Sequence, residues 1–302
     1  MIRHFLRLID TPPAELKHLL SEAARLKADV YRGLRPPILA GKSLGMIFEK
    51  PSLRTRVSFE AGMAQLGGTS IFLGDAALGK RESIADFART LSGYVDAVVL
   101  RTFHHTTIEE FAKHSSVPVI NGLSDLSHPC QALGDLLTIQ EVFGGIEGKT
   151  LVFVGDGNNV ARSVAVGCGV FGMRFILAAP EGYGFDEEFL ARYHLSFPKA
   201  ELILNGSPHH AVDKADVIYT DVWTSMGQEA ERQERQRKFS PFQVNSALLD
   251  RAPAHARVMH CLPAVRGEEV SAEVIDGDRS IVFQQAENRM HAQKALLAWL
   301  MG

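Results

Sequence analysis

Cysteine is scarce in this chain, which has only Cys130, Cys168 and Cys261 among its 302 residues. These cysteines are too few and too scattered for a disulfide framework, and no two of them have the short spacing that is typical of a zinc site. We therefore expect a protein of the reducing cytoplasm that holds no metal.

Long apolar runs and an excess of one charge are missing as well. The longest weakly polar stretch, residues 163–173, is rich in glycine and about half as long as the roughly 20 residues that a membrane-spanning helix needs. Charges interrupt the apolar residues of the N-terminus, unlike those of a signal peptide. A formal charge of −3 provides no basic excess for nucleic acid. We therefore expect neither a membrane nor a nucleic-acid partner.

What the chain does have is apolar material, 46% of its residues, which is enough for two compact cores. Short apolar runs of strand type alternate with helical patterns in two series. The runs are residues 44–48, 70–73, 97–100 and 117–120, and then residues 151–154, 175–178, 202–204, 217–220, 258–262 and 281–283. Because strands that are joined through helices pair in parallel, this alternation predicts an α/β protein with two doubly wound parallel-sheet domains.

The domain junction is expected after a helix over residues 129–143. This helix is followed by Gly144 and Gly145, where glycine can adopt the left-handed conformation that ends helices. We therefore predict a first domain over residues 1–145 and a second over residues 146–286. A last amphipathic helix, residues 287–302, is expected to pack back on the first domain.

The segment from Ser52 to Arg56 has the features of a phosphate site. It follows the first predicted strand and precedes apolar residues with helical spacing, so it lies at a helix N-terminus. Free backbone N–H groups, the helix dipole, two hydroxyls and the guanidiniums of Arg54 and Arg56 would meet there, as a phosphate requires. The alternative is that Ser52 only caps the helix and both arginines are solvated.

Two other segments place polar groups where strands or helices of the first domain begin or end. Arg101 directly follows the run 97–100, at the strand end where open α/β sheets bind ligands. His128 and Gln131 flank the start of the helix over residues 129–143, in which Pro129 suits the first position. His128 alone is more often a structural histidine, but beside Arg101 it becomes a candidate for polarising a carbonyl.

In the second domain, the run 151–154 leads into residues 155–160, which begin like a dinucleotide fingerprint. Val160 stands where the third glycine belongs, so a turn that presents Asn158 or Asn159 to a small polar substrate is the better interpretation. Asp221 follows the run 217–220 and Ser225 comes soon after it, which suits an ammonium group. Asp221 could equally cap a turn.

His260 and Cys261 suggest a metal site or a cysteine nucleophile, and both must be considered. Adjacent strand residues point to opposite faces, so one site could not easily use both side chains. We therefore expect a buried Cys261 whose functional groups are those of its backbone. The pairs at residues 104–105 and 209–210 are interpreted as surface histidines without a role.

Together these segments resemble the aspartate/ornithine carbamoyltransferase family over nearly the whole chain. The resemblance is carried in order by residues 48–56, 128–131, 155–159, 221–227 and 260–263, and the loop 225–227 is similar to that of the ornithine-specific members. It implies transfer of the carbamoyl group of carbamoyl phosphate to the side-chain amine of L-ornithine, giving citrulline and phosphate. It also implies an active site in the cleft between the domains, a homotrimer or a multiple of trimers, no cofactor, and a place in arginine biosynthesis.

The resemblance also implies roles for individual residues. Arg101, His128 and Cys261 would be catalytic. Carbamoyl phosphate would be bound by Ser52, Leu53, Arg54, Thr55, Arg101, His128, Gln131, Cys261, Leu262 and Arg289. Ornithine would be bound by Asn159, Asp221, Ser225 and Met226. Because an alkyl amine is mostly protonated at neutral pH and only its neutral form attacks a carbonyl, the rate should rise with pH.

The sequence departs from the family pattern at three positions. Ala77 stands where relatives usually place a glutamine that reaches carbamoyl phosphate in a neighbouring subunit. Either Lys80 or Arg81 substitutes for it, or the contact is lost. Arg162 and Val265 stand where relatives often carry histidine, which bears on the details of the ornithine pocket.

Three other functions compete with this interpretation. An acylornithine or putrescine carbamoyltransferase should lack the loop 225–227. A nicotinamide dehydrogenase would need the third glycine and an acidic residue after the next strand, where only Glu181 is suggestive. A non-catalytic amino-acid-binding module would keep Asp221 and Ser225 but would not need the segment 52–56.

Overall fold

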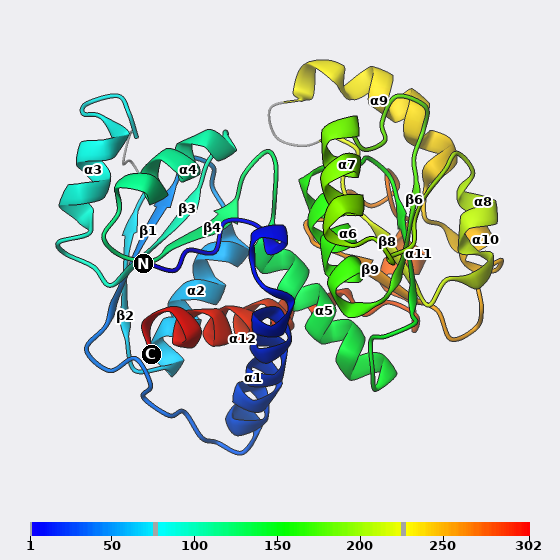
Figure 1. The fold of residues 1–302 in the computed structure, drawn as a ribbon. Coiled ribbons are helices and arrows are strands. Elements are labelled where there is room, and N and C mark those ends of the chain that lie inside the picture. The colour runs from blue at the N-terminus through cyan, green and yellow to red at the C-terminus, as the bar shows by residue number, and fades with distance from the viewer. Residues whose placement is uncertain (1, 75–77, 225–227) are drawn as a thin grey trace. The chain divides into compact units, whose positions relative to one another are not determined.

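The computed structural model describes residues 2–74, 78–224 and 228–302. The chain forms two compact units, one of Met1–Leu137 with Glu287–Gly302 and one of Thr138–Ala286 (Figure 1). The boundaries between the units fall inside two helices, α5 (Pro129–Phe143) and α12 (Val282–Met301). In the described ranges, no helix combines the length and the apolar character that crossing a membrane requires.

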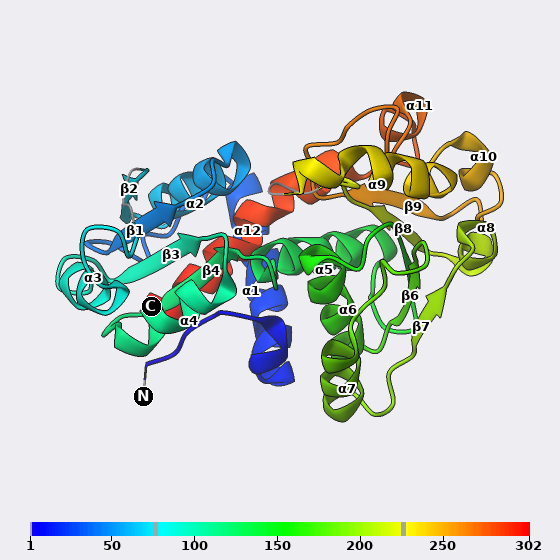
Figure 2. The same cartoon turned by 90° about the horizontal axis from the view of Figure 1, so that it is seen from above.

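The first unit is built on a parallel sheet of four strands in the order β2-β1-β3-β4. Its strands are β1 (Ser43–Phe48), β2 (Thr69–Leu73), β3 (Ala97–Arg101) and β4 (Val119–Leu123). Its helices include α1 (Pro13–Tyr31), α2 (Leu53–Gln65), α3 (Ile84–Leu91) and α4 (His105–His114), with a short 3-10 turn η1 (Leu8–Asp10). Helix α2 lies on one face of the sheet and α3 and α4 lie on the other, as right-handed crossovers require (Figure 2).

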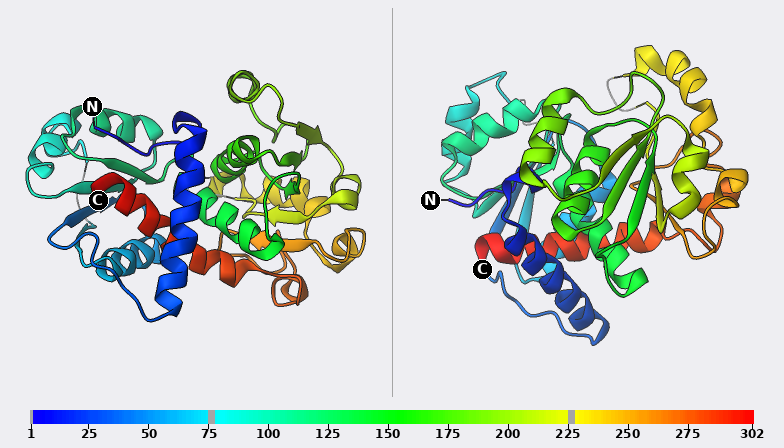
Figure 3. Two further views of the ribbon diagram at one scale, coloured as in Figure 1. Left: turned by 60° about the horizontal axis from the view of Figure 1, so that its bottom comes forward. Right: turned by 45° about the vertical axis from the view of Figure 1, so that its right-hand side comes forward.

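The C-terminal helix α12 belongs to the first unit from Glu287 onward. This part of α12 crosses α1 (Figure 3), where Lys27 Nζ donates to Asn288 Oδ1 over 2.7 Å and Trp299 Nε1 donates to Glu15 Oε2 over 2.6 Å. The sequence-based strand at residues 281–283 is wrong. Ile281 N still donates to Val258 O, but the chain enters the helix at the next residue, so no strand forms.

The second unit is built on a parallel sheet of five strands in the order β7-β6-β5-β8-β9. Its strands are β5 (Thr150–Val154), β6 (Arg174–Ala178), β7 (Leu202–Asn205), β8 (Val217–Thr220) and β9 (Arg257–His260). Its helices are α6 (Asn159–Phe171), α7 (Glu187–Ser196), α8 (Pro208–Ala211), α9 (Arg232–Phe239), α10 (Ser246–Leu249) and α11 (Ala272–Ile275), with 3-10 turns η2 (Val212–Lys214), η3 (Glu229–Glu231) and η4 (Ser240–Phe242). Helices α6 and α7 cover one face and α8 and α10 cover the other (Figure 1).

These two sheets confirm the predicted α/β class with two doubly wound parallel sheets. The predicted end of α5 is also confirmed, because Gly144 follows Phe143 with a left-handed φ of 67°. In each sheet the chain reverses its direction of winding between two neighbouring strands, β1 and β3 in the first unit and β5 and β8 in the second. Ligands of open α/β sheets bind at the carboxyl ends of such strand pairs.

Candidate functional site

In the first unit, the segment after β1 forms the N-terminus of α2, as the sequence predicts. Ser52 is the N-cap, and its Oγ accepts a hydrogen bond from Thr55 N over 3.3 Å. The same hydroxyl lies 3.0 Å from Thr55 Oγ1 and donates to it. Ser52 therefore does cap the helix, but the cap also fixes a second hydroxyl, that of Thr55, which is fully buried.

Two arginines from distant parts of the first unit meet at the Thr55 hydroxyl. Arg289 Nη2 donates to Thr55 Oγ1 over 2.9 Å, and Arg101 Nη1 donates to the same atom over 3.5 Å. Both arginines are nearly buried, with 3% and 7% of their surface exposed. Because the start of α2 also carries a positive partial charge, this cluster strongly favours an anion over a neutral ligand.

His128 lies beside these arginines and is 5% exposed. Burial and the positive charges of Arg289 and Arg101 hold the pKa of His128 well below its ordinary value of 6.5. The imidazole is therefore uncharged at neutral pH, and it carries one N–H that can donate a hydrogen bond. This is the protonation state that a carbonyl-polarising histidine needs.

Gln131 and Gly134 lie near the start of α5, and Gly134 faces Arg289 of α12. Gln131 is fully buried and its Nε2 donates to Asp135 Oδ1 over 2.8 Å. Among the described residues, Gln131 Oε1 has no hydrogen-bond partner. Gly134 lets α12 approach closely, because a Cβ at this position would lie 3.1 Å from Arg289 Cα and 3.2 Å from Arg289 N.

Arg56 of the predicted phosphate segment has its own partners on α2 and β2. The guanidinium of Arg56 lies over the ring of Phe72 at 4.0 Å, and its Nε donates to Glu60 Oε1 over 2.9 Å. The guanidinium of Arg56 therefore contacts Phe72 and Glu60 on the exposed side of α2. The prediction that both guanidiniums converge on the start of the helix is wrong for Arg56. The Leu53 side chain is 75% exposed, so only its backbone N–H can belong to the anion site.

Sequence reasoning missed the role of Glu49 next to this site. Glu49 Oε2 accepts a hydrogen bond from Phe103 N over 2.9 Å, and Glu49 N donates to Arg101 O over 2.8 Å. Glu49 thereby ties the end of β1 to the residues after β3. Its position inside the segment 48–56 was a signal that could have indicated this role.

In the second unit, Asp221 follows β8 and is 8% exposed. Its carboxylate accepts hydrogen bonds from Asn158 Nδ2, Val222 N and Cys261 Sγ, over 2.8, 2.8 and 3.0 Å. A carboxylate has about four acceptor sites, so these donors leave roughly one site for a ligand. Asp221 is thus the centre of a side-chain network, and the alternative of a simple turn cap does not describe it.

The turn after β5 positions two asparagines at the start of α6. Asn158 is the N-cap, whose Oδ1 accepts from Val160 N and Ala161 N over 3.0 Å each. Asn159 is the first helical residue, and its Oδ1 also accepts from Val160 N, over 2.9 Å. A Cβ at Gly157 would lie 2.8 Å from the backbone of Gly184, so glycine is required there for chain packing.

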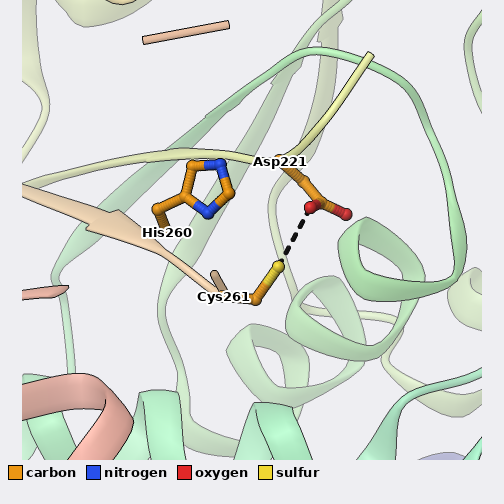
Figure 4. Close-up of side chains that lie close together, drawn as sticks. All are labelled: Asp221, His260 and Cys261. Atoms are coloured by element: carbon orange, nitrogen blue, oxygen red, sulfur yellow. Dashed lines mark hydrogen bonds between the residues drawn. The ribbon is translucent and has the colours of Figure 1, made fainter. Parts of the chain in front are cut away.

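Cys261 differs from its prediction. It is partly exposed, whereas a buried side chain was expected. The argument that His260 and Cys261 must point apart is also wrong, because β9 ends at His260 and Cys261 no longer follows the strand geometry. Figure 4 shows the result, in which the side chains of Asp221, His260 and Cys261 lie close together. Their ligand atoms are all within 4.8 Å of one another.

The spacing of these three side chains would suit a metal ion, but their ligand atoms already form hydrogen bonds with other groups. His260 Nδ1 accepts from Leu262 N over 2.8 Å, and His260 Nε2 lies 3.0 Å from Glu269 Oε1. Cys261 Sγ donates to Asp221. A cation would have to replace several of these hydrogen bonds, so the geometry favours a hydrogen-bonded network over a metal centre.

A buried ion pair beside Asp221 was not predicted. Arg235 Nη1 donates to Asp156 Oδ2 over 2.7 Å and to Trp223 O over 3.1 Å. Burial raises the pKa of Asp156 above its ordinary value, although its bond to Arg235 opposes this shift. The pair joins the turn after β5 to the residues after β8, and Arg235 comes from α9, which is distant in sequence from both.

The remaining sequence-based candidates are placed as follows. Ser225, Met226 and Ala77 lie outside the described residues. Arg162 is held by Asp186 over 2.6 Å, and Val265 is 37% exposed.

The histidine pairs separate into one buried residue and three exposed ones. His105 is buried, with its Nδ1 2.8 Å from Ser124 Oγ, so its interpretation as a surface residue is wrong. As the first residue of α4, it packs against the segment after β4. His104, His209 and His210 are exposed as predicted.

The fold and these two groups of residues define a two-unit α/β protein with a candidate anion site in one unit and a carboxylate network in the other. Residues 3–141 match the family model for the carbamoyl-P binding domain of aspartate/ornithine carbamoyltransferases, and residues 147–300 match the model for their Asp/Orn binding domain. The chain therefore belongs to the aspartate/ornithine carbamoyltransferase family.

Individual relatives agree with this assignment over the full length of the chain. The chain is 52% identical to an ornithine carbamoyltransferase of Bacillus subtilis, over 98% of this chain and 92% of the relative. It is similar to the solved ornithine carbamoyltransferase of Pyrococcus furiosus, with a TM-score of 0.96 and 50% identity over 99% and 97% of the two chains. The solved anabolic ornithine carbamoyltransferase of Campylobacter jejuni gives a TM-score of 0.92 and 36% identity over 99% of each chain.

Proposed function

We propose that this chain transfers the carbamoyl group of carbamoyl phosphate to the side-chain amine of L-ornithine, giving L-citrulline and phosphate. The observation that carries the proposal is the convergence of Arg289 and Arg101 on the Thr55 hydroxyl at the start of α2, with the neutral His128 beside them. This cluster offers positive charge for a phosphate and a neutral donor for a carbonyl in one place.

The residues of the first unit are assigned to carbamoyl phosphate. The backbone N–H groups at the start of α2 and the side chains of Ser52 and Arg54 bind the phosphate. Arg101, His128 and Gln131 bind and polarise the carbamoyl group, and Arg289 completes this set. Backbone groups of Leu53 and Thr55 act together with the helix dipole, which explains why an exposed leucine side chain is compatible with a binding role.

The residues of the second unit are assigned to ornithine and to the carbamoyl amide. Asp221 and Ser225 bind the α-ammonium group, and Asn159 and Met226 bind the rest of the amino-acid end. The backbone carbonyls of Cys261 and Leu262 accept hydrogen bonds from the carbamoyl NH2 group. The partial exposure of Cys261 supports its access to a substrate.

The chemistry balances without a cofactor or a protein base. The neutral side-chain amine of ornithine attacks the carbonyl carbon, and the carbonyl oxygen takes up negative charge beside Arg101 and His128. The new C–N bond forms, the C–O bond to phosphate breaks, and the departing phosphate accepts the proton that the amine loses. Because only the neutral amine attacks, the rate rises with pH toward the amine pKa, which is about 10.4 for an unperturbed alkyl amine.

The proposal also covers the location of the protein, its assembly and its pathway. We place the protein in the cytoplasm, which its few and scattered cysteines favour, and we expect a homotrimer or a multiple of trimers, as the family resemblance implies. The similarity to an enzyme described as anabolic favours arginine biosynthesis over the reverse, catabolic direction.

A phosphate-release assay with a panel of amines tests the proposal. Carbamoyl phosphate is supplied with L-ornithine, acetylornithine, putrescine or aspartate, and the rate of phosphate release above the rate without amine is measured. We expect release with ornithine alone. Preference for acetylornithine or putrescine would move the chain to another branch of the family, and no stimulation by any amine would contradict a carbamoyltransferase.

A further inference from the structure

A buried histidine–glutamate pair lies next to the Cys261–Leu262 segment in the second unit. His260 Nε2 and Glu269 Oε1 are 3.0 Å apart, and both side chains are 0% exposed. Removing such a pair of polar groups from water is unfavourable unless the pair satisfies further hydrogen bonds. The pair therefore needs an explanation other than surface solubility.

The pair holds the backbone on both sides of the Leu262–Pro263 peptide. Leu262 N donates to His260 Nδ1 over 2.8 Å, and Val265 N donates to Glu269 Oε1 over 2.6 Å. Because Nδ1 accepts a hydrogen bond, the imidazole proton must be on Nε2, where it is donated to Glu269. Glu269 thus selects the tautomer that binds the Leu262 N–H.

Leu262 adopts a backbone conformation that leucine disfavours. Its φ is 58°, and it is the one positive φ of a residue other than glycine in the described ranges. The left-handed region is unfavourable for a leucine because its Cβ crowds the following carbonyl oxygen, and such a conformation persists only where the surroundings determine it. The hydrogen bond from Leu262 N to His260 is such a determinant, and this conformation sets the directions of the Cys261 and Leu262 carbonyls.

We propose that His260 and Glu269 are positioning residues, which aim the Cys261 and Leu262 carbonyls at the carbamoyl NH2 group during transfer. This inference rests on the proposed function, in which those carbonyls bind that group. His260 itself cannot touch a substrate, because its side chain has no exposed surface. Its effect must pass through the Leu262 N–H.

The position of the two nitrogens of His260 allows a matched pair of variants. In His260→Asn, the side-chain oxygen lies near the place of Nδ1, so the contact to Leu262 N is kept and the contact to Glu269 is lost. In His260→Gln, the amide lies near the place of Nε2, so the contact to Glu269 is kept and the contact to Leu262 N is lost. Both variants are neutral and polar, and each removes one hydrogen bond.

Steady-state kinetics with ornithine and carbamoyl phosphate distinguishes the two contacts. We expect kcat of His260→Asn to stay within about threefold of the unmodified enzyme, a change below 1 kcal/mol. We expect kcat of His260→Gln to fall roughly 10- to 100-fold, because misplaced groups lose transition-state contacts. KM for carbamoyl phosphate should change less than kcat in both variants, because the residues assigned to the phosphate are not altered.

Several outcomes would overturn the inference. Equal kcat values for the two variants would assign the pair a purely structural role. Losses of kcat in proportion to the fall in melting temperature of each variant would do the same. If the His260 variants do not fold, Glu269→Gln and Glu269→Ala replace them: the glutamine keeps an oxygen for Val265 N and His260, and the alanine does not. A larger kcat loss for Glu269→Ala is then expected, and equal activity contradicts the inference. Absence of ornithine turnover by the unmodified enzyme would instead contradict the proposed function.

Discussion

At the scale of single residues, the Thr55 hydroxyl organises the candidate anion site. It accepts hydrogen bonds from Arg289 and Ser52 within 3.0 Å and from Arg101 at 3.5 Å. One small side chain thereby orients two guanidiniums that come from β3 and α12. The orientation, more than the number of positive charges, is what a bidentate contact to phosphate requires.

Replacing Thr55 with valine tests this role. Valine has nearly the same shape, so the fold should persist, but the arginines lose their shared acceptor. Hydrogen bonds to charged groups contribute about 1.5–3 kcal/mol, so we expect KM for carbamoyl phosphate to rise roughly 10- to 100-fold. Thr69→Val is the control, because Thr69 is exposed and its Oγ1 contacts Lys42 O over 3.4 Å. A variant at Thr55 with unchanged KM would show that the arginines are held in another way.

The low pKa of His128 predicts a dependence of stability on pH. Below about pH 6.5 the unfolded chain gains a proton at this histidine and the folded chain does not, so folding loses stability as pH falls. One group contributes at most about 1.4 kcal/mol per pH unit in this way. In His128→Gln, the urea midpoint should therefore fall less steeply between about pH 6.5 and about pH 5 than in the unmodified protein. Parallel curves for the two proteins would contradict a neutral, buried His128.

At the scale of elements, the close approach of α5 and α12 positions Arg289. Gly134 is the residue that permits it, since a Cβ there would meet the backbone of Arg289 at 3.1 Å. Arg289 lies seven residues after the start of α12 at Val282, within the part that packs in the first unit. The position of Arg289, a candidate site residue, therefore depends on helix packing as well as on its own side chain.

Gly134→Ala separates packing from helix propensity. Alanine favours an α-helix over glycine by about 1 kcal/mol, but here its Cβ would displace the Arg289 backbone. We expect kcat/KM for carbamoyl phosphate to fall roughly tenfold or more, although α5 itself should not be weakened. Gly145→Ala, where no atom lies within 4 Å of the added Cβ, should leave kcat/KM unchanged. Equal activity of both variants would argue that α12 tolerates the shift.

The elements themselves were largely predictable because their signals are local. Buried parallel strands show as short apolar runs, and the runs at residues 44–48 and 151–154 became β1 and β5. The run at residues 281–283 failed, because three apolar residues suit the first turn of a helix as well as a strand. Tertiary contacts decided between them, and the helix continued into the segment that packs on α1.

The candidate site was predictable where it follows strand ends and unpredictable where it depends on side-chain contacts across the chain. Arg101 and Asp221 were found from their places after β3 and β8. Three contacts join residues that are not neighbours in the sequence, so no local pattern indicates them. They are the shared acceptor at Thr55, the Arg235–Asp156 pair and the His260–Glu269 pair. Cys261 was misjudged because strand alternation was applied beyond the end of β9.

At the scale of the whole molecule, the two units have related designs and different ligand chemistry. Each is a parallel sheet with candidate residues after the two strands where the winding reverses. The first gathers arginines at a helix N-terminus, and the second gathers hydrogen-bond donors around a carboxylate. This division matches the two family models, one for carbamoyl phosphate and one for an amino acid.

The most direct test of the account follows the carbamoyl group itself. Carbamoyl phosphate labelled with carbon-13 is incubated with L-ornithine and the enzyme, and citrulline is measured by mass spectrometry beside the phosphate released. We predict labelled citrulline in equal amount to the phosphate released above the rate without amine, with no labelled product from acetylornithine or putrescine. Release of phosphate without labelled citrulline, or a faster reaction with either of the other amines, would contradict it.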